Sequence, residues 1–180
     1  MLKTVKIAIL MGGNLGNSAE IFAEAVRKLE ANGVKAIRQS RLHRTAPVDC
    51  VPGTPEFSNA ALTGEWSRSA ETLLELTQRL EREAGRPACH SSRESRTLDL
   101  DLILFGERCS NSPVLTLPPP RARQRRFVLE PLAEIAPEMR FPDTGESVAE
   151  ALHRLEKAEK EERFGENRGV CGENSRKKRS

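Results

Sequence analysis

The stretch 95-SRTLDLDLILFGE-107 is apolar enough for a buried strand, yet it carries two aspartates, Asp99 and Asp101. A buried carboxylate is costly unless a cation or several hydrogen bonds compensate its charge. Side chains two residues apart on a strand point to the same face, so both aspartates project together while the leucines beside them face the other way. The stretch therefore predicts a strand over about residues 97–105 with one apolar face and one acidic face.

Two interpretations of the acidic face remain open from this pattern. Carboxylates two residues apart on a strand lie about 7 Å apart, and Mg²⁺ typically takes one or two carboxylates together with phosphate oxygens and water. Pairs of such ions recur in phosphoryl chemistry. Alternatively, Asp99 and Asp101 face solvent and form ion pairs with Arg93 or Arg96.

Arginines gather on both sides of the acidic strand. A guanidinium group matches the geometry of phosphate oxygens and keeps its charge at any ordinary pH. Two carboxylates between basic loops are typical of nucleotide-triphosphate chemistry, in which metal ions neutralise one side of the phosphates and arginines the other. Solvated loop charge is the alternative reading. The arginines are Arg86, Arg93 and Arg96 upstream, and Arg121, Arg123, Arg125 and Arg126 downstream.

The remaining chain alternates between extended and helical patterns. Strands are expected at 4–10, 34–44 and 56–66, and helices after caps at Asn17 and Ser69, with Glu20 completing a capping box for the first. The proline-rich segment 117–126 is expected to be irregular, and a final helix that becomes polar all round is expected over 147–162. The order β-α-β-β-α-β predicts an α+β protein, a ferredoxin-like sandwich with a mainly antiparallel sheet and helices packed on it.

The segment "GGNLGN" (12–17) follows the first expected strand. It matches neither the G-x-G-x-x-G pattern nor a P-loop, because no Gly-Lys-Ser/Thr sequence follows. We interpret it mainly as a tight turn, with phosphate binding as the less favoured alternative.

A chain of 180 residues suits one domain. Residues 157–180 hold eight Lys or Arg and five Glu, which accounts for the net charge of +3 of the chain. They lack periodic apolar positions, so we expect a domain over residues 1–156 and a disordered tail over 157–180.

Composition also bears on compartment and partners. The chain has no run of about 18 apolar residues, so we expect no membrane span. We interpret the N-terminal segment as a strand rather than a signal peptide. No basic and aromatic cluster indicates nucleic-acid binding, although the basic tail leaves an RNA-binding module as a disfavoured alternative. We expect a cytoplasmic monomer with reduced thiols. The cysteines are Cys50, Cys89, Cys109 and Cys171.

Several segments, taken in order, resemble the 6-hydroxymethyl-7,8-dihydropterin pyrophosphokinases of folate synthesis. The resemblance covers roughly residues 4–153. It implies a ferredoxin-like fold and the transfer of the β,γ-pyrophosphoryl unit of ATP to the hydroxymethyl group of the pterin, with release of AMP. The matching segments are "GGNLGN", "RTAPV" (44–48), "FSNAAL" (57–62), "RTLDLDLILFG" (96–106) and "FVLEPLAEIAPE" (127–138).

The resemblance also implies a role for individual residues. Asp99 and Asp101 would hold two Mg²⁺ ions and, with Arg86 and Arg96, would form the catalytic set. Loops 45–55 and 85–95 would close over the substrates. The residues implied for ATP are Gln78, Glu81, Arg86, Arg96, Arg121 and Arg125, and those implied for the pterin are Thr45, Pro47, Val48, Phe57, Asn59 and Phe127.

Two positions depart from the pattern of that family. Pro119 stands where the family usually has a histidine that contacts the triphosphate, and Arg93 stands where it often has a tryptophan. An active pyrophosphokinase is the leading hypothesis, since both aspartates are present. The alternative is a catalytically weakened relative that binds pterin or nucleotide without efficient turnover.

Overall fold

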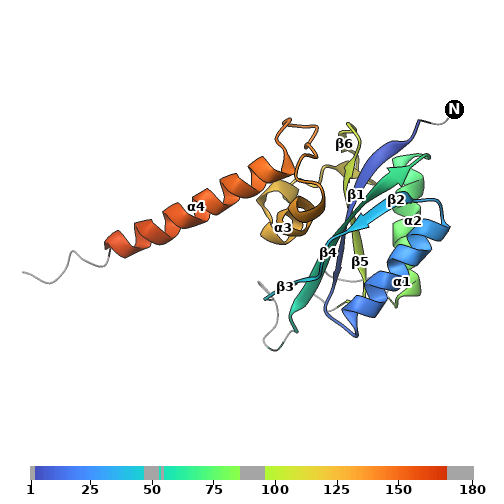
Figure 1. The fold of residues 1–180 in the computed structure, drawn as a ribbon, viewed down its shortest axis with the longest axis horizontal. Helices are drawn as coiled ribbons and strands as arrows, with labels where there is room; N and C mark the ends of the chain where they lie inside the picture. The colour runs from blue at the N-terminus through green and yellow to red at the C-terminus, as the bar shows by residue number, and fades with distance from the viewer. Residues whose placement is uncertain (1–2, 47–52, 54, 86–95, 170–180) are drawn as a thin grey trace, which may run out of the picture.

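A computed structural model describes residues 3–46, 53, 55–85 and 96–169 of the chain. Its central sheet lies between two layers of helices (Figure 1). The strands are β1 (Val5–Gly13), β2 (Lys35–Gln39), β3 (His43–Thr45), β4 (Phe57–Trp66) and β5 (Asp99–Phe105), with a separate two-stranded sheet of β6 (Ser110–Asn111) and β7 (Thr116–Leu117). The helices are α1 (Ser18–Ala31), α2 (Ala70–Glu83), the 3-10 helix η1 (Ala122–Gln124), α3 (Arg126–Ile135) and α4 (Val148–Gly169).

The strands of the central sheet follow the order β2-β4-β1-β5, with β3 also paired to β4, and each of these pairings is antiparallel. The predicted α+β class and mainly antiparallel sheet are confirmed. The single strand predicted over 34–44 is wrong in detail, because it is divided into β2 and β3. Ser40 lies between these two strands and belongs to neither of them. Its side-chain Oγ accepts a hydrogen bond from the Ala61 N–H at 2.9 Å.

Helices α1 and α2 cover one face of the sheet. Phe22, Ala25 and Leu29 recur at helical spacing on α1 and are buried, as are Leu73 and Leu80 on α2. They pack against alternate residues of β1, β4 and β5, since a strand presents every second side chain to one face. The apolar periodicity of the sequence thus determines which sides of both helices meet the sheet.

The two predicted helix caps have different outcomes. Ser69 caps α2 as predicted, and its Oγ accepts a hydrogen bond from the Thr72 N–H at 3.2 Å. Asn17 precedes α1, but its side chain makes no capping hydrogen bond, so the predicted capping box is wrong. Both residues have extended backbone, with ψ of 162° at Ser69 and 92° at Asn17, so backbone class alone does not separate them.

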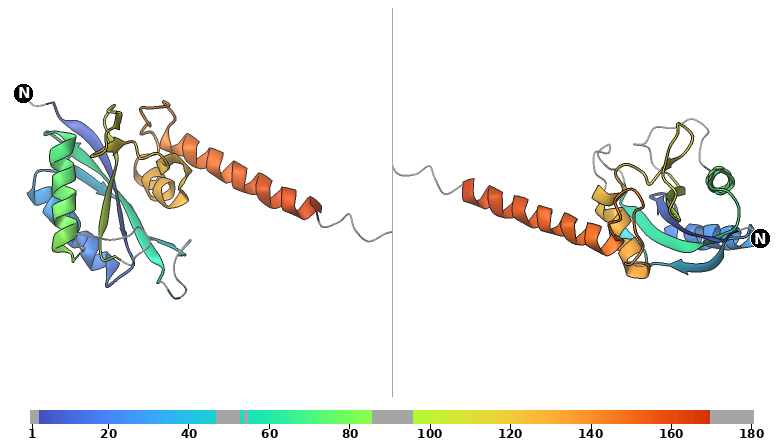
Figure 2. Two further views of the ribbon diagram at one scale, coloured as in Figure 1. Left: turned by 180° about the vertical axis from the view of Figure 1, so that it is seen from behind. Right: turned by 90° about the horizontal axis from the view of Figure 1, so that it is seen from above.

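Helix α3 and the first turns of α4 cover part of the other face, as the two views of Figure 2 show. Val128 and Leu132 of α3 pack with Ala8 and Leu10 of β1 and with Ile103 of β5 in a second core. Segment 117–126, which was predicted to be irregular, contains Leu117 of β7 and the turn of η1. The turn forms because the prolines precede it, where a missing N–H costs nothing.

Helix α4 continues away from the body of the molecule through Gly169 (Figure 1). The expected final helix therefore extends to Gly169, and the disorder expected for the rest of the tail stays a prediction, because residues 170–180 lie outside the described residues. Residues 157–169 are rich in Glu, Lys and Arg, which favour helix without an apolar face. Arg126 of α3 also supports it, through ion pairs with Glu156 at 3.4 Å and Glu159 at 2.5 Å.

Within the described ranges, no helix has both the length and the apolar character that a membrane crossing requires. Cys109 is exposed and carries a free thiol. Cys50, Cys89 and Cys171 lie outside the described residues, so their expected reduced state stays a prediction.

Replacing Phe22 with alanine tests the core beneath α1. Phe22 is fully buried, and truncation of a buried phenylalanine typically costs about 3–5 kcal/mol of unfolding free energy. Urea denaturation should show this loss for Phe22→Ala. Val114→Ala is the control, because Val114 is 74% exposed, and it should leave stability nearly unchanged. A loss for Phe22→Ala below about 1 kcal/mol would contradict the packing described here.

Candidate active site

A row of polar residues crosses the sheet on the face that α3 partly covers. Asp99, the first residue of β5, pairs with Gly12 of β1, and Gly12 pairs with Asn59 of β4. Cross-strand partners share a face of the sheet, so Asp99 and Asn59 project on the same side. Asn59 is buried, and its Nδ2 donates a hydrogen bond to Thr45 Oγ1 on β3 at 3.0 Å. Four strands thus bring a carboxylate, an amide and a hydroxyl together.

Gly12 stands at the centre of this row and leaves space in it. A Cβ at Gly12 would lie 3.4 Å from Asn59 Oδ1 and 3.9 Å from Asp99 Cβ. A side chain here would fill the gap between the amide and the carboxylate. The glycine therefore keeps open the region where a ligand can touch both groups.

The strand β5 has the two faces that its sequence predicts. Leu98, Leu100 and Leu102 are buried against α1 and α2. Asp99 is half-buried and Asp101 is exposed, and both lie on the opposite face. The carboxylates avoid the core because the register of β5 on β1 directs them toward the open side.

Arg96 forms an ion pair with Asp99 just before the strand. Its Nη1 lies 2.5 Å from Asp99 Oδ2, and both side chains are 17% exposed. A carboxylate has about four lone-pair sites, so Asp99 can accept this bond and still bind a cation. Among the described residues, no group of three or more His, Cys, Asp or Glu side chains forms a complete metal cage. Two carboxylates with an open side fit Mg²⁺, which completes its shell with phosphate and water oxygens.

Glu81 has a structural role that the sequence did not predict. It is a buried residue of α2 with an exposed fraction of 6%, and its Oε1 accepts a hydrogen bond from the Leu100 N–H at 2.7 Å. Because β5 ends the strand order, its outer N–H groups need partners from outside the sheet. Glu81 thereby holds the backbone between the two aspartates. Its predicted contact with ATP stays a prediction.

The two phenylalanines expected to hold the pterin lie on the same side of the sheet. Phe57 is half-buried at the start of β4 and shares the face of Asn59, and half-buried Phe127 packs against the second core from α3. The guanidinium carbon of Arg125 lies 5.6 Å from the centre of the Phe127 ring, within cation–π range. Arg125, expected on the ATP side, is thus brought beside a residue expected on the pterin side.

The structure says less about the other residues expected in the site. Gln78 on α2 and Arg121 before η1 are both exposed. Pro47, Val48, Arg86 and Arg93 lie outside the described residues, as do most of loops 45–55 and 85–95. Their predicted roles, including closure of the loops, stay predictions.

A contact between α3 and the segment around β3 was not predicted. Glu134 accepts a hydrogen bond from the Arg41 N–H at 3.0 Å, and its Oε2 lies 3.0 Å from His43 Nε2. The Arg41 N–H, followed by the His43 ring, holds the pKa of Glu134 below its usual value. No short-range pattern could reveal this contact, because more than 90 residues separate the partners.

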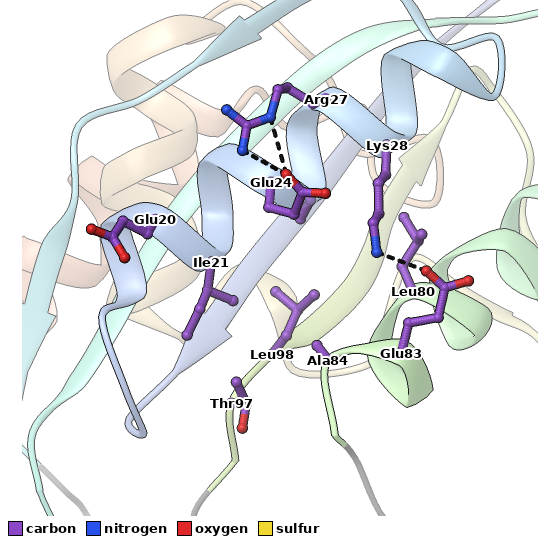
Figure 3. A pocket seen from close by; sticks show the side chains of 11 residues that line it. Glu20, Ile21, Glu24, Arg27, Lys28, Leu80, Glu83, Ala84, Thr97 and Leu98 are labelled. Atoms are coloured by element: carbon purple, nitrogen blue, oxygen red, sulfur yellow. Dashed lines mark hydrogen bonds and ion pairs between the residues drawn. The ribbon is translucent and has the colours of Figure 1, made fainter.

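A cavity of about 410 Å³ lies between α1 and α2 on the other face of the sheet. Figure 3 shows Ile21, Leu80 and Leu98 within it and charged groups along its rim. Lys28 pairs with Glu83 at 2.8 Å, and Arg27 pairs with Glu24 at 2.5 Å. Leu98 points into this cavity, whereas Asp99 points to the opposite side of the strand, so the cavity is separate from the polar row.

Residues 8–137 match the family model described as 7,8-dihydro-6-hydroxymethylpterin-pyrophosphokinase. The chain is 33% identical over 149 residues to the folic acid synthesis protein fol1 of Pneumocystis carinii, which covers 83% of this chain and 20% of that protein. It is 33% identical over 147 residues to the 2-amino-4-hydroxy-6-hydroxymethyldihydropteridine pyrophosphokinase of Synechocystis sp., which covers 81% of this chain and 74% of that protein. The chain thus spans only part of the length of its relatives.

Solved structures with a similar fold include HPPK-DHPS of Plasmodium falciparum. The wild-type protein with pteroate aligns with a TM-score of 0.63 at 11% identity, over 90% of this chain and 44% of that one. The wild-type protein with pterin and p-hydroxybenzoate aligns with a TM-score of 0.65 at 12% identity, over 90% of this chain and 45% of that one. At this identity the likeness establishes the fold alone.

Replacing Glu81 tests whether it holds the edge of β5. Glu81→Ala leaves the Leu100 N–H without this acceptor, which typically costs about 1–3 kcal/mol in a buried setting. Glu81→Gln keeps an oxygen acceptor and should lose less. Urea denaturation and amide exchange at Leu100 measure both effects, with the exposed Glu75→Ala on the same helix as control. Unchanged protection of the Leu100 amide in Glu81→Ala would contradict this role.

Proposed function

The chain belongs to the 7,8-dihydro-6-hydroxymethylpterin-pyrophosphokinase family, and we propose that it transfers the β,γ-diphosphate of ATP to 6-hydroxymethyl-7,8-dihydropterin. The hydroxymethyl oxygen forms a bond to the β-phosphorus while the bond between the β-phosphorus and the α,β-bridging oxygen breaks. AMP leaves, and the hydroxyl proton is released. The observation that carries the proposal is the polar row within the matched residues, where Asp99 and Asn59 flank Gly12 on one face of the sheet.

Asp99 and Asp101 are the residues we propose to hold two Mg²⁺ ions. When bound with ATP, the ions would neutralise phosphate charge. The support is the chemistry of the donors, since carboxylates on one face with an open side suit a hard cation. The ion pair with Arg96 offsets part of the charge of Asp99 before any ligand arrives.

The arginines and the second helix are proposed to bind the triphosphate. Arg96 is mostly buried beside Asp99, so its guanidinium group is pre-oriented and stays charged. Such fixed donors stabilise charge that develops on a leaving phosphate. We propose the same class of contact for Gln78, Arg86, Arg121 and Arg125. Glu81 has no hydrogen to donate, so it is proposed only to line the nucleotide side of the site.

Asn59 is proposed to recognise the amide edge of the pterin. One hydrogen of its Nδ2 serves Thr45, which orients the amide group. Its Oδ1 and the remaining Nδ2 hydrogen can then offer an acceptor and a donor to the ligand. We propose that Phe57 and Phe127 stack on the flat ring, and that backbone groups at Thr45, Pro47 and Val48 complete the site.

A second candidate function is a weakened relative that binds its ligands with little turnover. Pro119 favours it, because a proline side chain cannot donate a hydrogen bond to phosphate. The Pro119 carbonyl instead accepts a hydrogen bond from the Ala122 N–H at 2.9 Å and begins η1. Residue 119 is therefore the position at which to test whether the chain has lost a contact to phosphate.

Partners and compartment are also proposals. We propose a monomer that acts on ATP and the pterin in the cytoplasm, without a nucleic-acid partner. Relatives differ in these respects: one from Arabidopsis thaliana is named a mitochondrial folate synthesis bifunctional protein.

Replacing either aspartate tests the proposed activity. Asp99→Asn or Asp101→Asn removes a negative charge from the proposed metal site at nearly constant shape, so AMP formation should fall about 10³-fold or more, the equivalent of several kcal/mol. Circular dichroism should show both variants folded. Asp143→Asn is the control. It makes the same chemical change at an aspartate that forms an ion pair with Arg123 and that is not among the proposed site residues, so this variant should keep wild-type activity. AMP release at the wild-type rate from either site variant would refute the metal assignment.

Replacing Pro119 with histidine separates the two candidate functions. A weakened enzyme should gain turnover from Pro119→His, because an imidazole can donate to phosphate oxygens, and the gain should appear in kcat/KM for ATP. Pro120→His, at the exposed neighbouring position, is the matched control. Efficient AMP formation by the wild type with no gain in Pro119→His would exclude the weakened relative.

A further inference from the structure

The turn after β1 lies directly against the segment that enters β5. Asn14 is buried there, with an exposed fraction of 7%. Its backbone N–H donates to the Arg96 carbonyl oxygen at 2.9 Å, and its side-chain Oδ1 accepts from the Arg96 N–H at 2.8 Å. A single residue thus bonds both backbone polar groups of Arg96, as a strand partner would, although the two lie 82 positions apart.

Two neighbours of Asn14 reinforce this contact. The Leu15 N–H also donates to the Arg96 carbonyl oxygen, at 3.3 Å. A Cβ at Gly13 would lie 2.5 Å from the Thr97 carbonyl oxygen, which is closer than real Cβ atoms approach. The glycine is therefore required for the turn to touch the β5 segment at all.

These bonds argue against a phosphate-binding turn. A phosphate loop needs backbone N–H groups that point at the ligand. Here the N–H groups of Asn14 and Leu15 point at a carbonyl oxygen of the same chain. The turn instead fixes the backbone of Arg96, whose guanidinium group then reaches Asp99 three residues further on.

We propose that Asn14 is a positioning residue that acts through Arg96. It holds the Arg96 backbone so that the Arg96–Asp99 pair is already arranged for the phosphates of Mg²⁺-bound ATP. Ordering these groups in advance removes an entropy cost from ligand binding. The inference rests on the proposed function, because it assumes that this pair meets a nucleotide.

The test is a double-mutant cycle between Asn14→Ala and Arg96→Ala. Asn14→Ala alone should lower kcat/KM for ATP about 10–100-fold, as loss of a supporting contact does at other sites. With Arg96 already replaced, the further effect should be within about twofold, because Asn14 then has no guanidinium group to position. Additive losses would overturn the proposal. Asn17→Ala is the matched control in the same turn, since its side chain makes no capping bond, and it should leave activity unchanged.

Two readouts do not depend on turnover. Exchange of the Arg96 amide should be about 10-fold faster in Asn14→Ala, and titration calorimetry with Mg²⁺ and a non-hydrolysable ATP analogue should show weaker binding. Asn14→Asp keeps an oxygen acceptor and should restore Arg96 amide protection. If Asn14→Ala does not fold, Asn14→Ser replaces it in the cycle. Unchanged Arg96 exchange would refute the clamp, whereas a wild type that binds the analogue but makes no AMP would refute only the proposed activity.

Discussion

The antiparallel pairing of β5 with β1 is the constraint on which the site depends. It places Asp99 opposite Gly12 and Asp101 opposite Leu10. A slip of one residue would turn the aspartates into the core beneath α1 and α2 and expose the leucines to water. The burial of those leucines therefore holds the carboxylates in place, so the packing that stabilises the fold also arranges the chemistry.

The site lies on β5, an edge strand that has a neighbouring strand on one side only. Three other parts of the protein support this strand. The β1 ladder holds one side of β5, Glu81 of α2 accepts the outward Leu100 N–H, and Asn14 holds the Arg96 backbone where the chain enters the strand. These supports come from different elements. A site whose supports converge in this way stays rigid while the open face remains available to ligands.

The sequence predicted what depends on neighbours along the chain. The alternation of leucine and aspartate identified both faces of β5, and the pattern after Ser69 identified α2 with its cap. It was less reliable where side-chain geometry rather than residue type decides, as at Asn17, whose side chain makes no capping hydrogen bond. It also ended the last helix near residue 162, whereas α4 continues to Gly169, because helix-forming charged residues and a disordered tail have similar composition.

By itself, then, the sequence determined the secondary structure of most of the chain, the acidic face and, through ordered motifs, the expected family. Only the tertiary structure decided which distant groups meet there. Asn59 and Asp99 share a face because both pair with Gly12, and Asn14 reaches Arg96 across 82 positions. Periodicity reports the direction of each side chain relative to its own element, whereas register and packing between elements depend on long-range contacts that no local pattern encodes.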